Sequence, residues 1–180
     1  ETAPAAATPT MFLDANGEPD PKKSRDSALA IGVPGTVAGL ALAREKYGSG
    51  KFSLADLMEP AIRLAEQGVR IEDDTADSLP GARDRLARWP AAAAIFLKNG
   101  GEPLEAGDRL LQFDLADTLK LIAEKGPAGF YEGRTAKTLA RDIHATGGII
   151  TEDDLKNYRA VVRQPVRGTY RGYDIVSMPP

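Results

Sequence analysis

The chain has 180 residues, of which 42% are hydrophobic and 27% are charged, and its formal net charge at pH 7 is −3. Without a basic excess or an apolar run of roughly 20 residues, this composition is that of an ordinary globular protein and predicts neither a nucleic-acid partner nor a membrane span. The absence of cysteine and the single histidine, His144, exclude thiolate nucleophiles, disulfides and two-histidine metal motifs.

We interpret residues 1–180 as a single domain with three parts. Residues 1–31 read as an extended or loop-like entry, residues 32–158 as mostly helical and residues 159–180 as strands. The expected fold class is therefore mainly α with a C-terminal β-hairpin, that is, an α+β fragment.

The first helical patterns follow the turn "GVPG" at residues 32–35. Thr36 is the expected N-cap of a helix that stops at Gly48. Ser53, with Asp56 three residues later, forms a variant of the capping box and begins the next helix. Because proline lacks the N–H and clashes with the preceding turn, Pro60 must bend this helix or begin another.

In the middle of the chain, stretches with apolar residues at helical spacing alternate with residues typical of turns. Pro80-Gly81 predicts a break between two short helices. Residues 95–97 read as extended and enter a turn at residues 99–101, with a second turn at Gly107-Asp108. Asp114 is the expected cap of the helix that follows, which Gly126-Pro127 ends.

In the last part of the chain the hydrophobic pattern changes from the period of a helix to that of strands. Residues 133–148 place an apolar stripe on one helix face before a glycine pair, and Thr151 with Asp154 caps one more short turn. Residues 161–162, 166–170 and 173–178 then read as strands, with Arg171-Gly172 as the hairpin turn and Pro165 at an edge or a break. Such a small sheet is poorly stable alone, so further strands are expected outside this chain.

A series of sequence blocks keeps a fixed order and spacing along essentially the whole chain. They read "ETAPAAAT..MFLD.NG.PD.KKS", "GVPGTVAGLALA..KYG", "L..L.EPAI.LAE.G", "L.Q.DLA.TL..IAE.GP..FY.G" and "GGIIT..DL..Y.A..R.P..G.YRGY.I.SMPP". Together they resemble the gamma-glutamyltranspeptidase family, also called gamma-glutamyltransferase or glutathione hydrolase. The resemblance implies an internal fragment of the large subunit, with both ends of the chain as cuts.

The resemblance also implies a parent of the N-terminal nucleophile hydrolase type, an αββα sandwich made as a precursor that cleaves itself into large and small subunits. The threonine that begins the small subunit attacks the gamma-glutamyl amide, with its own amino group as the base. An arginine directly before Glu1 holds the substrate's α-carboxylate, and backbone donors stabilise the oxyanion. We therefore assign no catalytic, substrate-binding or metal-ligating residue and no cofactor to this chain, and expect it to be inactive alone.

Five features have a functional and a simpler structural interpretation, and the structural one is preferred each time. Glu1 could influence the electrostatic field at the arginine that the resemblance implies directly before it, or it could simply be a residue at the end of a loop. Residues 32–36 could bind an anion at a helix N-terminus, or form a turn and cap. His144 suits a helix C-terminus better than catalysis. The carboxylates of 72–74 and 152–154 could bind a cation, but negative charge is favourable in a first helical turn anyway.

Two functions from different classes stay open. The first is a fragment of an enzyme that hydrolyses or transfers the gamma-glutamyl group of glutathione-like compounds, with a cephalosporin-acylase-type member of the family as a variant. The second is a free-standing helical protein-interaction module. Expected partners of the fragment are the remaining large subunit and the small subunit, or further copies of itself through uncovered apolar faces. Family analogy implies a periplasmic or extracellular location.

Overall fold

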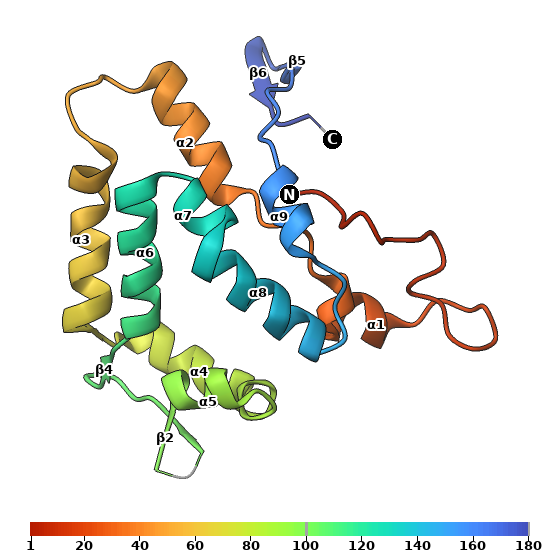
Figure 1. Ribbon diagram of the computed structural model, residues 1–180, viewed down its shortest axis with the longest axis vertical. Coiled ribbons are helices and arrows are strands. Elements are labelled where there is room, and N and C mark those ends of the chain that lie inside the picture. Colours follow the sequence, from red (N-terminus) through yellow and green to blue (C-terminus); the bar gives the residue numbers. More distant parts are fainter. Residues whose placement is uncertain (100, 180) are drawn as a thin grey trace. The chain divides into compact units, whose positions relative to one another are not determined.

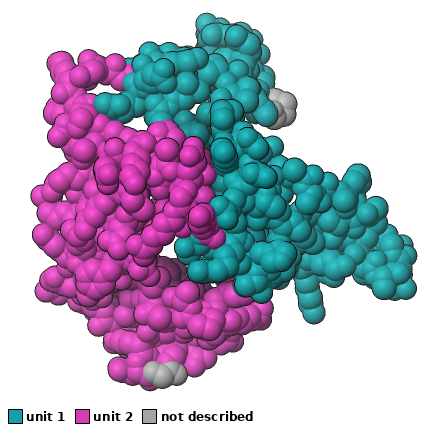
Figure 2. Space-filling view, viewed as in Figure 1, with its two compact units in different colours: residues 1–47, 138–180 teal, residues 48–137 magenta. Residues whose placement is uncertain are grey.

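The computed structural model describes residues 1–99 and 101–179. The chain divides into two compact units (Figure 2). Unit 1 comprises residues 1–47 and 138–180, and unit 2 comprises residues 48–137. Each unit has buried side chains of its own and is described by itself below.

Helices dominate the described part of the chain (Figure 1). The helices are α1 (Pro21–Asp26), the 3₁₀ helix η1 (Ala28–Ala30), α2 (Thr36–Tyr47), α3 (Leu54–Gln67), α4 (Asp73–Ala87), α5 (Pro90–Phe96), α6 (Phe113–Lys125), α7 (Ala128–Tyr131), α8 (Gly133–Ala145) and α9 (Glu152–Asn157). The strands are β1 (Val69–Arg70), β2 (Leu97–Lys98), β3 (Glu102–Pro103), β4 (Arg109–Leu110), β5 (Val166–Tyr170) and β6 (Tyr173–Ser177). The mainly helical class with a C-terminal hairpin is confirmed.

Unit 1 buries a small set of apolar side chains from its two chain segments. They are Ala28, Val33, Ala140, Ile143, Ile150 and Leu155. The predicted stripe of α8 accounts for Ala140 and Ile143, and the predicted glycine stop follows it. A Cβ on Gly148 would lie 2.4 Å from Cγ2 of Ile143 and 2.8 Å from the carbonyl oxygen of Ala28. Only glycine therefore lets the chain turn back so closely against this core.

In unit 2, α3 and α6 lie side by side (Figure 1). The N–H of Gln112, just before α6, donates to the carbonyl of Ala65 in α3 at 3.0 Å. An ion pair between Lys120 and Glu66 joins the same helices. The other part of the core is a cluster formed by Ile71, Leu79 and Leu104. Strand pairing of β1 with β4 places Val69 opposite Leu110 at the edge of that cluster.

Of the two alternatives predicted for Pro60, a bend within one helix or the start of a second helix, the structure excludes the second. Pro60 lies inside the continuous helix α3, and Pro80 lies inside α4. The predicted break at Pro80-Gly81 is therefore wrong. Leu79, immediately before this proline, is buried against Ile71 and Leu104, and this tertiary packing outweighs the local helix penalty.

Several predicted boundaries also differ from those observed. Thr36 is the first residue of α2 rather than its cap, and Asp114 lies inside the first turn of α6, whose N-cap is Gln112. Ile95 and Phe96 belong to α5, because the alanine-rich run before them favours helix. The entry 1–31 contains α1 and η1 and is thus not wholly extended.

The turn predicted at 99–101 is only partly described, because Gly100 lies outside the described residues; Asn99, with a φ of 46°, adopts the left-handed conformation. The hairpin of β5 and β6 is confirmed, with Arg171 and Gly172 at φ values of 52° and 84°. Residues 161–162 form no strand, since they pair with nothing in the described sheets.

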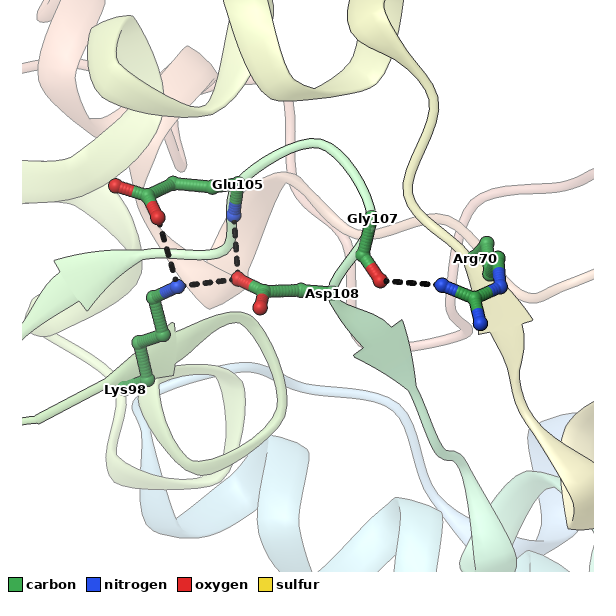
Figure 3. Close-up of polar contacts among 5 residues, drawn as sticks. All are labelled: Arg70, Lys98, Glu105, Gly107 and Asp108. Atoms are coloured by element: carbon green, nitrogen blue, oxygen red, sulfur yellow. Dashed lines mark hydrogen bonds and ion pairs between the residues drawn. The ribbon is translucent and has the colours of Figure 1, made fainter.

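A polar cluster in unit 2 fixes the loop between β3 and β4 (Figure 3). Lys98 pairs with Asp108 and, at 3.1 Å, with Glu105. The same Asp108 carboxylate accepts the N–H of Glu105 at 2.7 Å. On the other side of the loop, the guanidinium of Arg70 donates to the carbonyl of Gly107 at 3.2 Å. Asp108 therefore closes the loop through both backbone and side-chain contacts.

Acidification should open this loop. The hydrogen bond from the Glu105 N–H and the bond from Lys98 lower the pKa of Asp108. The stability that the ionised Asp108 side chain contributes is therefore complete above its pKa in the unfolded chain, about 3.9. This stability is lost as the pH falls through the lower pKa of the folded state. We expect the NMR shift of the Glu105 amide to titrate with a midpoint below about 3.9. Asp108→Asn should abolish this transition, and a midpoint above that value would contradict the assignment.

Candidate functional site

A cavity of about 1050 Å³ lies in unit 1. Its walls come from the first residues of the chain and Val33, from α9 with its flanking residues, and from the two residues that follow β6. The lining residues are Glu1, Thr2, Ala3, Ala5, Val33, Thr151, Asp153, Asp154, Asn157, Tyr158, Arg159, Val161, Arg163, Met178 and Pro179. Segments about 150 residues apart in sequence thus line the same cavity.

The first wall is the segment Glu1–Ala5, which has no helical hydrogen bonds of its own. A short antiparallel bridge pairs Thr2 with Val33, whose N–H donates to the carbonyl of Thr2 at 2.8 Å. Farther along, the N–H of Ala5 donates to Oδ1 of Asp154 at 2.8 Å. The segment is therefore fixed at two points by residues distant in sequence.

Asp154 also completes the predicted capping box of α9. Its Oδ2 accepts from the N–H of Thr151 at 2.8 Å and from the Thr151 hydroxyl at 2.7 Å, while the hydroxyl accepts the N–H of Asp154. Partial burial tends to raise the pKa of this carboxyl, but the hydrogen bonds from Ala5 and Thr151 outweigh it, so the pKa lies below its usual value. The charged form is thus the one that the structure favours.

The turn at residues 32–36 approaches Glu1 closely. A Cβ on Gly35 would lie 2.2 Å from Oη of Tyr158 and 2.9 Å from the backbone nitrogen of Glu1. A Cβ on Gly32 would lie 3.3 Å from Oε2 of Glu1. Because Gly32 and Gly35 have no side chains, Glu1 and Tyr158 can pack against this turn.

The cavity walls carry charges of both signs. Glu1, Asp153 and Asp154 supply carboxylates, and Arg159 and Arg163 supply guanidinium groups. The lining combines these charged groups with apolar side chains such as Val33, Val161 and Met178. The hydroxyl of Thr151 is engaged in the capping box.

The structure brings three of the five sequence candidates together. Glu1, Val33 of the turn 32–36 and two carboxylates of 152–154 line the cavity. His144 is exposed in the last turn of α8 and is not part of the lining, and residues 72–74 lie in unit 2 at the start of α4. Among residues 1–99 and 101–179, no group of three or more histidine, aspartate or glutamate side chains is arranged to hold a metal ion. No helix in this part combines the length and the apolar character that a bilayer crossing requires.

The sequence did not reveal three further residues of the cavity and one contact. Tyr158, Arg159 and Arg163 were not candidates, although they follow the capping box by only a few residues. The contact of Asp154 with Ala5 spans 149 positions and uses a backbone N–H. Since an alanine carries no side-chain signal, that contact had no signature in the sequence.

Comparisons with known proteins agree over the whole chain. The family model described as gamma-glutamyltranspeptidase matches residues 1–180. The glutathione hydrolase proenzyme of Escherichia coli (strain K12) is 48% identical over 181 residues, covering 100% of this chain and 31% of that protein. The corresponding proenzyme of Bacillus subtilis (strain 168) is 46% identical, with 100% and 30% covered. This chain thus spans about a third of the length of these relatives.

A solved structure is similar as well. The crystal structure of Helicobacter pylori gamma-glutamyltranspeptidase superposes with a TM-score of 0.94 and 45% sequence identity. The match covers 100% of this chain and 51% of that one. Elements of both compact units therefore have counterparts in that structure.

Proposed function

The chain belongs to the gamma-glutamyltranspeptidase family, and on that premise we propose that it is part of the large subunit of a glutathione hydrolase. The parent hydrolyses or transfers the gamma-glutamyl group of glutathione-like compounds through the N-terminal threonine of its small subunit. That threonine lies outside residues 1–180, so the chain alone is inactive. The parent acts in the periplasm or outside the cell.

The observation that carries this proposal is the full-length match at nearly half identity to glutathione hydrolase proenzymes, of which the chain spans about a third. The C-terminal hairpin agrees with it. Every residue of β5 and β6 is exposed, including Val166, Tyr173 and Val176, which are 50%, 74% and 54% exposed. A hairpin that leaves such apolar side chains uncovered is suited to packing against the remainder of a larger sheet.

The test is expression of the full-length precursor that contains this chain. We expect two polypeptides on a denaturing gel, a smaller one that begins with threonine, and release of glutamate from glutathione. A precursor whose threonine is replaced by alanine is the matched control and should stay uncleaved and inactive. The 180-residue chain alone should release no glutamate.

Three outcomes would contradict the proposal in different ways. A single uncleaved polypeptide without glutamate release would favour the helical interaction module. A cleaved protein that hydrolyses a cephalosporin side chain but not glutathione would instead identify an acylase-type parent. Glutamate release by the isolated 180-residue chain would refute its inactivity.

A further inference from the structure

The loop between Leu13 and Pro19 in unit 1 carries an asparagine directly before a glycine. Asn16 and Gly17 are both exposed, and a Cβ on Gly17 would meet nothing within 4 Å. Asparagine is a chemically labile residue type, and a glycine after it lets the next backbone nitrogen approach the side-chain carbonyl closely. The residue types and their exposure are therefore those of a deamidation site.

The backbone of this loop forms a tight turn that opposes the reaction. The N–H of Gly17 donates to the carbonyl of Asp14 at 3.2 Å, and the N–H of Asp14 donates to the carbonyl of Glu18 at 2.8 Å. Gly17 has a φ of 82°, which is typical of the left-handed glycine that ends a three-residue hairpin loop. The nitrogen that would attack the side chain of Asn16 is thus engaged as a hydrogen-bond donor.

One carboxylate closes the turn. Oδ1 of Asp14 accepts the N–H of Asn16 at 2.8 Å and the N–H of Glu18 at 3.0 Å, so it bonds to the backbone on both sides of Gly17. The hydrogen bonds from Glu18 and Asn16 lower the pKa of Asp14, and bonds to such a charged acceptor are of the stronger type. The Gly17 nitrogen is therefore released only when these contacts break.

We propose that Asn16 is a latent deamidation site that the Asp14 carboxylate holds closed. When the turn opens, the backbone nitrogen of Gly17 loses its proton to solvent and forms a bond to Cγ of Asn16. The bond between Cγ and Nδ2 breaks, and Nδ2 takes a proton from water and leaves as ammonia, so that a cyclic imide remains. Water then adds to one imide carbonyl and breaks its C–N bond, which gives aspartate or isoaspartate without any change of oxidation state.

Either product changes the loop. A carboxylate replaces a neutral amide close to the carboxylate of Asp14, and isoaspartate also lengthens the backbone by one carbon. Repulsion between the like charges and the longer backbone both act against the bridge that pairs Leu13 with Pro19. The modified loop therefore stays open.

The test is storage of the full-length protein at neutral pH, followed by trypsin digestion and mass spectrometry. Asn16 is the only amide side chain between Glu1 and Lys22, the first trypsin site of this chain, so fragment masses assign the change to it. We expect Asp14→Ala to deamidate about tenfold faster than the wild type, because losing bonds to a charged acceptor makes opening more frequent. The products should be a mixture of isoaspartate and aspartate.

Asp20→Ala is the matched control, because it removes the same charge near the same loop. The side chain of Asp20 accepts the N–H groups of Lys22 and Lys23 at the start of α1 and makes no bond within the turn. This variant should therefore deamidate at the rate of the wild type. Asn16→Gln should abolish the modification, since glutamine would have to close a larger ring.

Each contrary outcome removes a different part of the proposal. An unchanged rate in Asp14→Ala, or an equal acceleration in Asp20→Ala, would overturn the closing role of Asp14. Aspartate without isoaspartate would indicate direct hydrolysis and overturn the attack by Gly17, and absence of any product in every variant would overturn the site itself. The measurement needs no gamma-glutamyl activity, so its result is independent of the proposed function.

Discussion

Gly129→Ala is expected to lower the free energy of unfolding of unit 2 by about 3 kcal/mol. A Cβ at this position would lie 2.1 Å from the carbonyl oxygen of Leu121, 2.4 Å from its carbonyl carbon and 2.8 Å from the nitrogen of Ile122. These are backbone atoms of α6, which cannot rotate away as a side chain can. The helix α7 would have to separate from α6, and the packing between them would be lost.

Gly81→Ala is the matched control for this prediction. Gly81 also lies in a helix of unit 2, but a Cβ there would meet nothing within 4 Å. Alanine is favoured over glycine inside a helix, so this variant should be more stable by about 0.5–1 kcal/mol. Urea unfolding followed by the fluorescence of Trp89, the chain's single tryptophan and a residue of unit 2, measures both changes. Destabilisation of equal size in the two variants would contradict the steric explanation.

Local signals in the sequence predicted local structure well. The capping boxes of Ser53 and Thr151 form as expected, because their donors and acceptors lie within four residues of one another. The hairpin turn at Arg171-Gly172 is confirmed for the same reason. One such signal was overlooked: Asp20 before Pro21 begins α1, with its side chain accepting the N–H groups of Lys22 and Lys23.

The errors arise where tertiary contacts decide. Proline at position 80 argues against a helix on local grounds, yet α4 continues through it because Leu79 is buried in the core of unit 2. The candidate site shows the same limit. The motif at 151–154 predicted the cap of α9, but no periodicity or spacing relates Asp154 to the N–H of Ala5. The sequence blocks therefore indicate the family, whereas the contact between Asp154 and Ala5 is visible only in the structure.

Leu155→Ala is expected to lower the free energy of unfolding of unit 1 by about 3 kcal/mol. Leu155 is 0% exposed and, with Val33, is among the largest fully buried side chains of the described residues. The helix α9 has only six residues and is too short to persist without packing, so the cavity left by the substitution should also loosen its attachment. The amide of Ala5, which depends on Asp154 of that helix, should then exchange its proton faster.

Urea unfolding followed by far-UV circular dichroism, together with hydrogen exchange at Ala5, tests both consequences of Leu155→Ala. The matched control is Leu40→Ala in α2 of the same unit, because Leu40 is 67% exposed and should cost no more than about 0.5 kcal/mol. Equal losses in the two variants would mean that Leu155 is not a core residue. Loss of stability without faster exchange at Ala5 would mean that the Glu1–Ala5 segment is held independently of α9.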